Sequence, residues 1–304
     1  MNQLFYQELL QSIPNLQIFV NEPMKKHTTF RIGGEADYLI TPDKEQLPVV
    51  LQLAKKHDVP VTVIGNGSNL LVSDRGVRGV VLEISKCMSE VTVDGNYIEA
   101  QAGALLSKVA AAAAEHGLSG LEFAAGIPGS IGGAVVMNAG AYGGELKDVL
   151  VSVSVLTPEG CLLTIPVEDM ELSYRHSCVP EKRYIVLAAR IALHPAAKEE
   201  IRAKMAELRE KRVEKQPLGF ASAGSTFKRP EGYFAGKLIM DAGLRGYRIG
   251  DAQVSEKHCG FVINRGNATA TEVMQLVRDV QQRVREQFQV ELEPEIKQIG
   301  EWEL

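Results

Sequence analysis

The clearest pattern in the chain is an apolar run that enters a turn of small residues and then resumes. Residues 61–64 read Val-Thr-Val-Ile, residues 65–69 read Gly-Asn-Gly-Ser-Asn, and a second apolar run covers residues 70–72. This order predicts a strand, a tight turn and another strand. Because the turn has few side chains, its backbone N–H groups are exposed and suit phosphate oxygens.

Apolar periodicity around this turn predicts a small α/β segment. We expect a βαβ unit that delivers the glycine turn, and a strand-forming run at residues 28–34 that ends in a glycine pair. The expected elements are a helix from Asn2 to Ile13, a strand from Tyr38 to Ile40, a helix from about Lys44 to His57, and a strand from Val59 to Ile64.

A second stretch, residues 126–144, contains seven glycines. So many glycines weaken a helix or a regular strand at nearly every step, so we expect neither. Two interpretations stay open for each loop: tight turns in a packed core, or close approach of the backbone to a ligand. The two loops together favour a large ligand that carries phosphate.

Neither loop matches a common nucleotide-binding fingerprint. Leu70 stands where the Rossmann pattern requires a third glycine that opens a helix. The nearest P-loop candidate, from Gly232 to Lys237, has three residues between its glycines rather than four. A nucleotide bound by this chain therefore binds through neither a Rossmann fingerprint nor a P-loop.

The second half of the chain predicts further strands and helices. We expect three segments: residues 1–84, 85–195 and 196–304. The expected elements are a hairpin around Asp94-Gly95-Asn96, a helix from Leu105 to His116 that ends at Gly117, a strand pair at 149–156 and 161–165, a strand at 184–193, helices at about 197–213, 235–242 and 270–288, and strands near 260–264 and 291–292.

Composition is that of an ordinary globular protein, with 304 residues, 45% of them hydrophobic and 23% charged. The net charge of −5 argues against broad nucleic-acid binding. We expect no membrane span and no signal peptide. The four cysteines are far apart, which suits free thiols in a reducing cytoplasm, and the six scattered histidines show no metal-binding spacing.

Three short motifs hold candidate catalytic groups. Arg175 follows Tyr174, and arginine grips a carboxylate with two hydrogen bonds, although a surface arginine is the commoner case. Ser225 follows Gly224, an arrangement that is more often a turn than a catalytic site, without the G-x-S-x-G elbow. Glu295 follows Pro294, and taken alone it reads as an edge-strand glutamate that faces water.

Together these motifs resemble the UDP-N-acetylenolpyruvoylglucosamine reductases (MurB) of bacterial cell-wall synthesis. The resemblance covers most of the chain through six motifs: residues 28–34, 65–69, 126–144, 174–175, Gly224-Ser225 with Phe227 and Pro230, and residues 292–295. The chain is short between Arg175 and Tyr184, so it resembles the compact branch that lacks a tyrosine-bearing loop.

The resemblance implies an α+β protein with the two-lobed FAD-binding fold of the vanillyl-alcohol oxidase (PCMH) type. Residues 1–84 and 85–195 would be the FAD-binding lobes, and residues 196–304 an α/β domain for the UDP-sugar. The implied activity is NADPH-dependent, FAD-mediated reduction of UDP-N-acetylglucosamine enolpyruvate to UDP-N-acetylmuramate. The implied setting is cytoplasmic peptidoglycan precursor synthesis, hence cell-wall biogenesis, cell shape and cell division, by a monomer or weak oligomer.

The family's roles carry over to matching positions. Ser225 matches the proton donor, and Arg175 and Glu295 match the pair that stabilises the reacting carboxylate. Matching UDP-sugar contacts are Tyr174, Lys215, Arg229, Arg245 and His258, of which Arg245 and His258 also read as solvated charges. Noncovalent FAD would lie on Gly65, Asn66, Gly67, Ser68, Asn69, Gly126, Pro128, Gly129, Ser130, Gly132, Gly133, Asn138, Ala139 and Gly140; no metal is implied.

Two other functions stay open at this point. One is a flavin-dependent oxidase of the same fold that acts on a small alcohol. Some such oxidases tether FAD through His or Cys, and no clear attachment motif surrounds His27 or Cys87. The other is a non-catalytic nucleotide-binding module, for which Arg175, Ser225 and Glu295 would be an accidental set.

Overall fold

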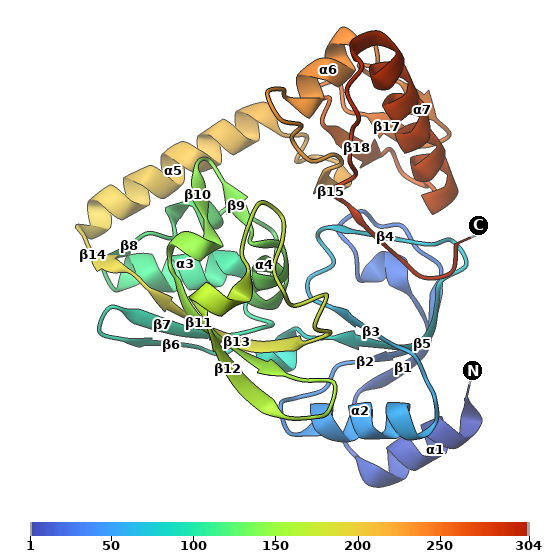
Figure 1. Ribbon diagram of the computed structural model, residues 1–304, viewed down its shortest axis with the longest axis vertical. Helices are drawn as coiled ribbons and strands as arrows, with labels where there is room; N and C mark the ends of the chain where they lie inside the picture. The colour runs from blue at the N-terminus through green and yellow to red at the C-terminus, as the bar shows by residue number, and fades with distance from the viewer. Residues whose placement is uncertain (1, 303–304) are drawn as a thin grey trace. The chain divides into compact units, whose positions relative to one another are not determined.

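A computed structural model describes residues 2–302 of the chain, except the side chain of Lys86. Its helices are α1 (Gln3–Ser12), α2 (Gln46–Lys56), α3 (Leu106–Glu115), α4 (Ile131–Met137), α5 (Lys198–Lys215), α6 (Ala235–Asp241) and α7 (Ala270–Phe288) (Figure 1). No helix within residues 2–302 is long and apolar enough to cross a membrane.

The strands of the first two thirds of the chain are mostly short. They are β1 (Ile18–Pro23), β2 (Glu35–Ile40), β3 (Val61–Ile64), β4 (Leu70–Val72), β5 (Val77–Glu83), β6 (Val91–Asp94), β7 (Tyr97–Gln101), β8 (Leu118–Ser119), β9 (Gly140–Ala141), β10 (Gly144–Glu145), β11 (Leu150–Leu156), β12 (Leu162–Pro166), β13 (Ile185–Ala192) and β14 (His194–Pro195). The C-terminal strands are β15 (Ala221–Ser225), β16 (Arg248–Ile249), β17 (Ala252–Val254), β18 (Phe261–Asn264) and β19 (Lys297–Ile299).

The chain divides into two compact units, and neither is a continuous segment. Unit 1 comprises residues 1–19, 39–66 and 79–212, and unit 2 comprises residues 20–38, 67–78 and 213–304. The three segments expected from the sequence are each continuous in the chain, whereas each of these units joins separate segments that pack together. The three-segment division therefore stays a prediction about domains.

The main sheet of unit 1 has five strands in the order β12-β11-β13-β7-β6, and adjacent strands are antiparallel. The expected hairpin is confirmed, because Asp94 pairs with Tyr97 and Gly95 adopts a positive φ of 56° at the turn. Helices α3 and α4 pack against β7. Gly117, with φ of 67°, follows α3 as a left-handed C-terminal residue, as its sequence predicted.

The predicted strand, helix and strand that lead to the first glycine turn are confirmed as β2, α2 and β3. The order of their sheet is β1-β2-β5-β3, so β5 lies between the two strands that the sequence predicted as one βαβ unit. β3 runs parallel to β5, with Val61 opposite Val80. After the turn the chain forms β4, as the apolar run predicted, and β4 pairs in parallel with β19.

Unit 2 is built on an antiparallel sheet of order β15-β18-β17-β16, and α6 and α7 belong to the same body (Figure 1). The apolar face of α7 buries Val273, Leu276 and Val280 in its core. Phe30 and Leu71 belong to that core too, although they lie about 200 residues from most of its members in the sequence. Long-range packing therefore joins N-terminal segments to the C-terminal sheet.

Three expected elements are wrong. Residues 28–34 form a tight turn instead of a strand, because the N–H of Arg31 donates to the carbonyl of Thr28 (3.1 Å) with Arg31 at φ of 56°. Residues 291–292 form no strand, and pairing here is a single bridge between Phe227 and Pro294. The second glycine stretch does contain a helix, α4.

Helix α4 forms despite two glycines because packing and capping outweigh propensity. The Ser130 hydroxyl caps it by accepting from the N–H of Gly133 (3.5 Å). A Cβ atom at Gly132 would lie 3.1 Å from the Cβ atom of Ala102, which follows β7, so the close packing of α4 here favours glycine.

Candidate functional site

The two glycine loops meet in unit 1. A Cβ atom at Gly65 would lie 2.3 Å from the hydroxyl oxygen of Ser130, so only glycine allows this approach. The side-chain amide of Asn66 donates to the carbonyl of Pro128 at 2.6 Å. Loops separated by about sixty residues are thus fastened together, as the phosphate-binding interpretation requires.

This junction offers backbone N–H groups to a ligand. Among residues 2–302, the N–H groups of Asn66, Gly129 and Ser130 donate to no protein acceptor, while those of Ile131 and Gly132 donate to Ala104 and Ala102. Unused N–H groups beside the half-buried Gly65 and Gly129 form a cradle that suits diphosphate oxygens. The residues present therefore fit the predicted FAD.

Gly133 has no structural reason to be glycine. A Cβ atom there would meet only the Ser130 hydroxyl, at 3.7 Å, and the residue is exposed within α4. Glycine in a helix costs roughly 1 kcal/mol relative to alanine. Packing against the protein does not require this glycine, so Gly133 stays a predicted FAD contact.

The first turn continues into unit 2, where its residues have structural roles as well. Gly67 has φ of 61°, and a Cβ atom there would lie 2.0 Å from the carbonyl oxygen of His27. The side-chain amide of Asn69 donates to the carbonyl of Glu295 at 3.1 Å. The turn therefore fixes the backbone of a predicted catalytic residue.

Asn138 is a buried structural centre beside the second loop, followed by Ala139 and Gly140. It adopts a left-handed conformation (φ 41°) at the end of α4 and is only 1% exposed. Its amide donates to Glu145 (2.8 Å) and to the Ser173 carbonyl (3.1 Å), and its oxygen accepts from the N–H of Lys147 (3.0 Å). Its side chain thus organises the protein around the second loop.

We expect Asn138→Ala to destabilise the protein by about 3 kcal/mol or more, because it removes buried hydrogen bonds and leaves alanine in a left-handed conformation. Urea unfolding of the purified protein measures this change. Asn96→Ala, at an exposed turn, is the control and should change stability by less than about 0.5 kcal/mol. Equal stability of the two variants would contradict the role of Asn138.

Arg175 follows Tyr174 in a left-handed conformation, with φ of 56°. Its guanidinium lies 4.9 Å from the centre of the Tyr174 ring, and its Nη2 atom donates to the carbonyl of Gly140 at 3.4 Å. The pKa of Glu145 is lowered, mainly by its hydrogen bond with Lys147 and to a smaller extent by the charge of Arg175. Arg175 is thus held beside the end of the second glycine loop, within unit 1.

Ser225 and Glu295 lie on neighbouring segments of unit 2. A bulge between Ser222 and Ser225 contains Gly224 at φ of 78°, and bulges of this kind redirect the following side chain. The N–H of Glu295 donates to the carbonyl of Thr226 at 2.8 Å. The two predicted catalytic residues, distant in sequence, therefore share one stretch of backbone pairing.

The predicted sugar contacts are mostly exposed cations. Lys215 ends α5, and Arg245 donates to the sulfur of Met240 at 3.1 Å. The guanidinium of Arg229 lies 4.0 Å from the centre of the Phe234 ring, which is 60% exposed. Arg229 also donates to the carbonyl of Tyr233 at 3.3 Å, and the role of these residues in sugar binding stays a prediction.

His258 differs from these cations because it is held neutral. Burial lowers the pKa of His258 below its usual value of 6.5. Its Nδ1 atom accepts from the N–H of Gly260 at 3.2 Å, and its ring packs edge-on against Phe261 with centroids 4.9 Å apart. At neutral pH His258 can therefore offer hydrogen bonds but no positive charge.

His258 predicts a pH dependence of stability. In the unfolded chain His258 takes up a proton below about pH 6.5, whereas the folded residue resists protonation. The contribution of His258 to the free energy of unfolding therefore falls as the pH drops from about 7.5 to 5.5. His258→Asn keeps an acceptor near the Nδ1 position and removes the titration. We expect its unfolding free energy to fall less over that range than the parent's. If the unfolding free energies of His258→Asn and the parent changed equally with pH, His258 would not be the source of the pH dependence.

Sequence patterns missed Arg212. Its guanidinium lies 3.1 Å from where a Cβ atom of Gly126 would be, and burial lowers its pKa. Arg212 thus explains the glycine at 126 and brings a positive charge to the second loop. Glutamates are interleaved with the basic residues of α5, so no local signal distinguishes Arg212.

Family comparisons cover both halves of the chain. Residues 36–166 match the family described as "FAD binding domain". Residues 216–299 match the family described as "UDP-N-acetylenolpyruvoylglucosamine reductase, C-terminal domain". The first match contains both glycine loops, and the second contains Ser225 and Glu295.

Relatives match over nearly the full chain. UDP-N-acetylenolpyruvoylglucosamine reductase of Agathobacter rectalis is 61% identical over 314 residues, covering 99% of this chain and 100% of that protein. The Lachnoclostridium phytofermentans protein of the same name is 52% identical, covering 99% of each. The crystal structure of the reductase from Thermus caldophilus superposes with a TM-score of 0.81 at 37% identity, covering 94% of this chain and 99% of that chain.

Proposed function

The chain belongs to the UDP-N-acetylenolpyruvoylglucosamine reductase family, and we propose on that premise that it is an NADPH-dependent flavoenzyme that reduces UDP-N-acetylglucosamine enolpyruvate to UDP-N-acetylmuramate. The observation that carries this proposal is the 61% identity over 99% of the chain. We place the activity in the cytoplasm, in peptidoglycan precursor synthesis, and in a monomer or weak oligomer. No observation favours the small-alcohol oxidase.

The cofactor cradle is supported by the contact of Gly65 with Ser130 and by the unused N–H groups beside it. We assign the FAD diphosphate to this junction, with Gly133 allowing close approach. Bound FAD supplies the chemistry of accepting hydride from NADPH and passing it to the vinyl carbon of the substrate. All other steps fall to groups of the protein.

Ser225 supplies the proton in this mechanism. Hydride addition to the vinyl carbon leaves negative charge on the adjacent carbon and its carboxylate, and the hydroxyl of Ser225 protonates that carbon. Arg175 stabilises the developing charge with its guanidinium. Glu295 orients Arg175 or a water molecule, or it donates a hydrogen bond from its protonated form, because an ionised carboxylate would repel the enolate.

Sugar-nucleotide binding is assigned to Tyr174, Lys215, Arg229, Arg245 and His258. Exposed cations suit a diphosphate through charge-assisted hydrogen bonds. His258, neutral at pH 7, is assigned a hydrogen bond with an uncharged part of the substrate.

A two-step anaerobic assay tests the proposal. NADPH added to the yellow protein should bleach the flavin absorbance, and UDP-N-acetylglucosamine enolpyruvate added next should restore it. Protein that is bleached by NADPH but stays bleached with the sugar would not be this reductase. Colour that remained with the chain after denaturation would contradict noncovalent FAD.

A further inference from the structure

Unit 2 contains a second cavity lined by none of the residues assigned to FAD or the UDP-sugar. Its volume is about 610 Å³, within the range of small-molecule sites. Residues 25–34 form one side, and the segment 266–269 before α7 forms the other. The turn at residues 28–34, which the sequence misread as a strand, thus shapes the cavity.

Positive charge gathers on one side of this cavity. Lys25, Lys26 and Arg31 line it, and Lys26 pairs with Glu22 at 3.1 Å. Within residues 2–302, neither the Lys25 ammonium nor the Arg31 guanidinium has a hydrogen bond or an ion pair with another group. Two cations are therefore free to meet an anion.

Asp74, the one acidic side chain of the lining, is already engaged. Its carboxylate accepts from the N–H groups of Ala270 and Thr271 at 2.8 and 2.9 Å, and from the Thr271 hydroxyl at 2.8 Å. These bonds direct the negative charge to the start of α7. Asp74 forms no ion pair with either Lys25 or Arg31.

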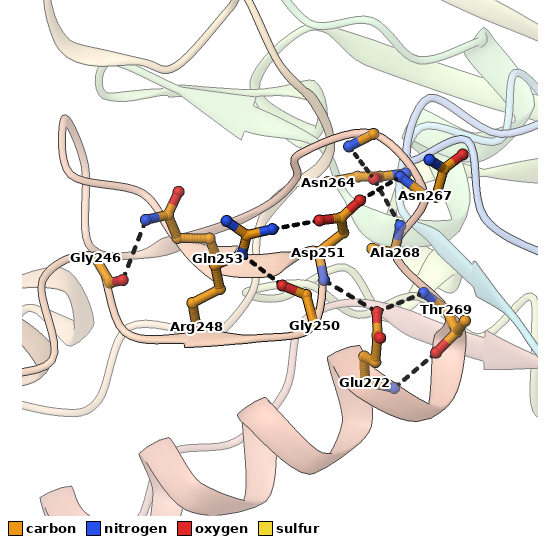
Figure 2. A network of polar contacts seen from close by, with 11 residues as sticks. Gly246, Arg248, Gly250, Asp251, Gln253, Asn264, Asn267, Ala268, Thr269 and Glu272 are labelled. Carbon is orange, nitrogen blue, oxygen red and sulfur yellow. Dashed lines mark hydrogen bonds and ion pairs between the residues drawn. The ribbon is translucent and has the colours of Figure 1, made fainter.

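A network of hydrogen bonds holds the opposite wall, as Figure 2 shows. The side-chain oxygen of Asn264 accepts from the N–H groups of Gly266 (2.8 Å) and Ala268 (3.0 Å). Asp251 accepts from the N–H of Asn267 at 2.9 Å, and Glu272 accepts from the N–H of Asp251 at 3.2 Å. Preorganised walls lower the entropic cost of binding.

Arg31 also holds an unfavourable backbone conformation. Its φ of 56° belongs to the left-handed region, which disfavours residues with a Cβ atom. Glycine would adopt this turn more easily. A strained arginine with an unpaired guanidinium that lines a cavity is typical of a ligand contact.

We propose that this cavity binds a small molecule with at least two negative charges, recognised through phosphate groups by Arg31 and Lys25. Arginine forms paired hydrogen bonds with phosphate oxygens, and lysine adds a point charge. The walls at Gly34 and Asn267 give the ligand a fixed surface on either side. This site is independent of the proposed reductase chemistry.

Calorimetric titration of the FAD-loaded protein with pyrophosphate, at low salt with a chelator present, tests the proposal. Arg31→Gly and Lys25→Gln should each weaken binding by roughly tenfold or more, because each removes a charged hydrogen bond. Arg229→Ala, which removes a cation assigned to the UDP-sugar, should keep the pyrophosphate binding that Arg31→Gly and Lys25→Gln weaken. Arg31→Gly should also melt at or above the temperature of the parent, since it relieves the left-handed strain.

Absence of pyrophosphate binding by the parent would overturn the proposal. Parental affinity in both Arg31→Gly and Lys25→Gln would also overturn it. Loss of pyrophosphate binding in Arg229→Ala would overturn it too, because the anion would then bind at the sugar site. A parallel titration with inorganic phosphate distinguishes a ligand with one phosphate group from a ligand with two. Weaker binding of phosphate than of pyrophosphate supports a ligand with two phosphate groups. Equal or tighter binding of inorganic phosphate would overturn that part.

Discussion

Ser225→Ala is expected to slow reoxidation of the reduced flavin by the enolpyruvyl sugar by about 10²–10⁴-fold, the usual contribution of general acid catalysis. This corresponds to roughly 3–5 kcal/mol of barrier at ~1.4 kcal/mol per tenfold. Reduction of the flavin by NADPH should keep its parental rate, because that step creates no substrate carbanion. Stopped-flow absorbance of each half-reaction measures both rates.

Two further variants sharpen this test. Ser225→Cys keeps a transferable proton and should reoxidise at a rate between those of Ser225→Ala and the parent. Ser222→Ala removes the same hydroxyl from the other side of the bulge in β15 and should leave both half-reactions unchanged. If Ser225→Ala slows flavin reduction as much as reoxidation, the residue is structural and its proposed role is wrong.

Gly133→Val should yield folded protein without FAD. The added Cβ atom meets only the Ser130 hydroxyl, at 3.7 Å, and Gly133 is exposed, so we expect the FAD-free fold to tolerate the substitution. In a helix, replacing glycine with valine is favourable by a few tenths of a kcal/mol, and replacing it with alanine is favourable by roughly 1 kcal/mol. The added methyl groups instead occupy the space proposed for the diphosphate. Flavin absorbance per mole of purified protein measures the loss.

Gly133→Ala provides the graded comparison, because it should stabilise the FAD-free protein while weakening FAD binding less than valine does. Gly219→Ala is the matched control: no atom lies within 4 Å of its added Cβ, so FAD content should stay parental. Gly133→Val purified with a full complement of FAD would place the diphosphate elsewhere. Loss of the fold in Gly133→Val would show that protein packing, after all, requires the glycine.

Local patterns predicted much of the secondary structure. Alternating apolar residues around Gly95 predicted the β6–β7 hairpin, and apolar residues at helical spacing predicted α7. The small residues between β3 and β4 predicted a turn, and its meeting with Ser130 fits the ligand-binding interpretation. These features depend on neighbours in the sequence, so turn chemistry and periodicity were sufficient.

The candidate catalytic residues came from motif resemblance, and physical patterns alone left each of them ambiguous. Ser225 read as a turn serine and Glu295 as an edge glutamate. Their common placement depends on the hydrogen bond from the N–H of Glu295 to Thr226, between segments about seventy residues apart. No local pattern encodes that contact.

What the sequence by itself determined was therefore the set of local elements and the two glycine loops. Tertiary structure alone decided that residues 28–34 turn and bury Phe30 in the core of unit 2, that α4 forms where propensity opposes it, and that burial lowers the pKa of His258. The physical reason is the same in each case. Burial and packing against distant segments outweigh the backbone preferences of about 1 kcal/mol per residue that local sequence expresses.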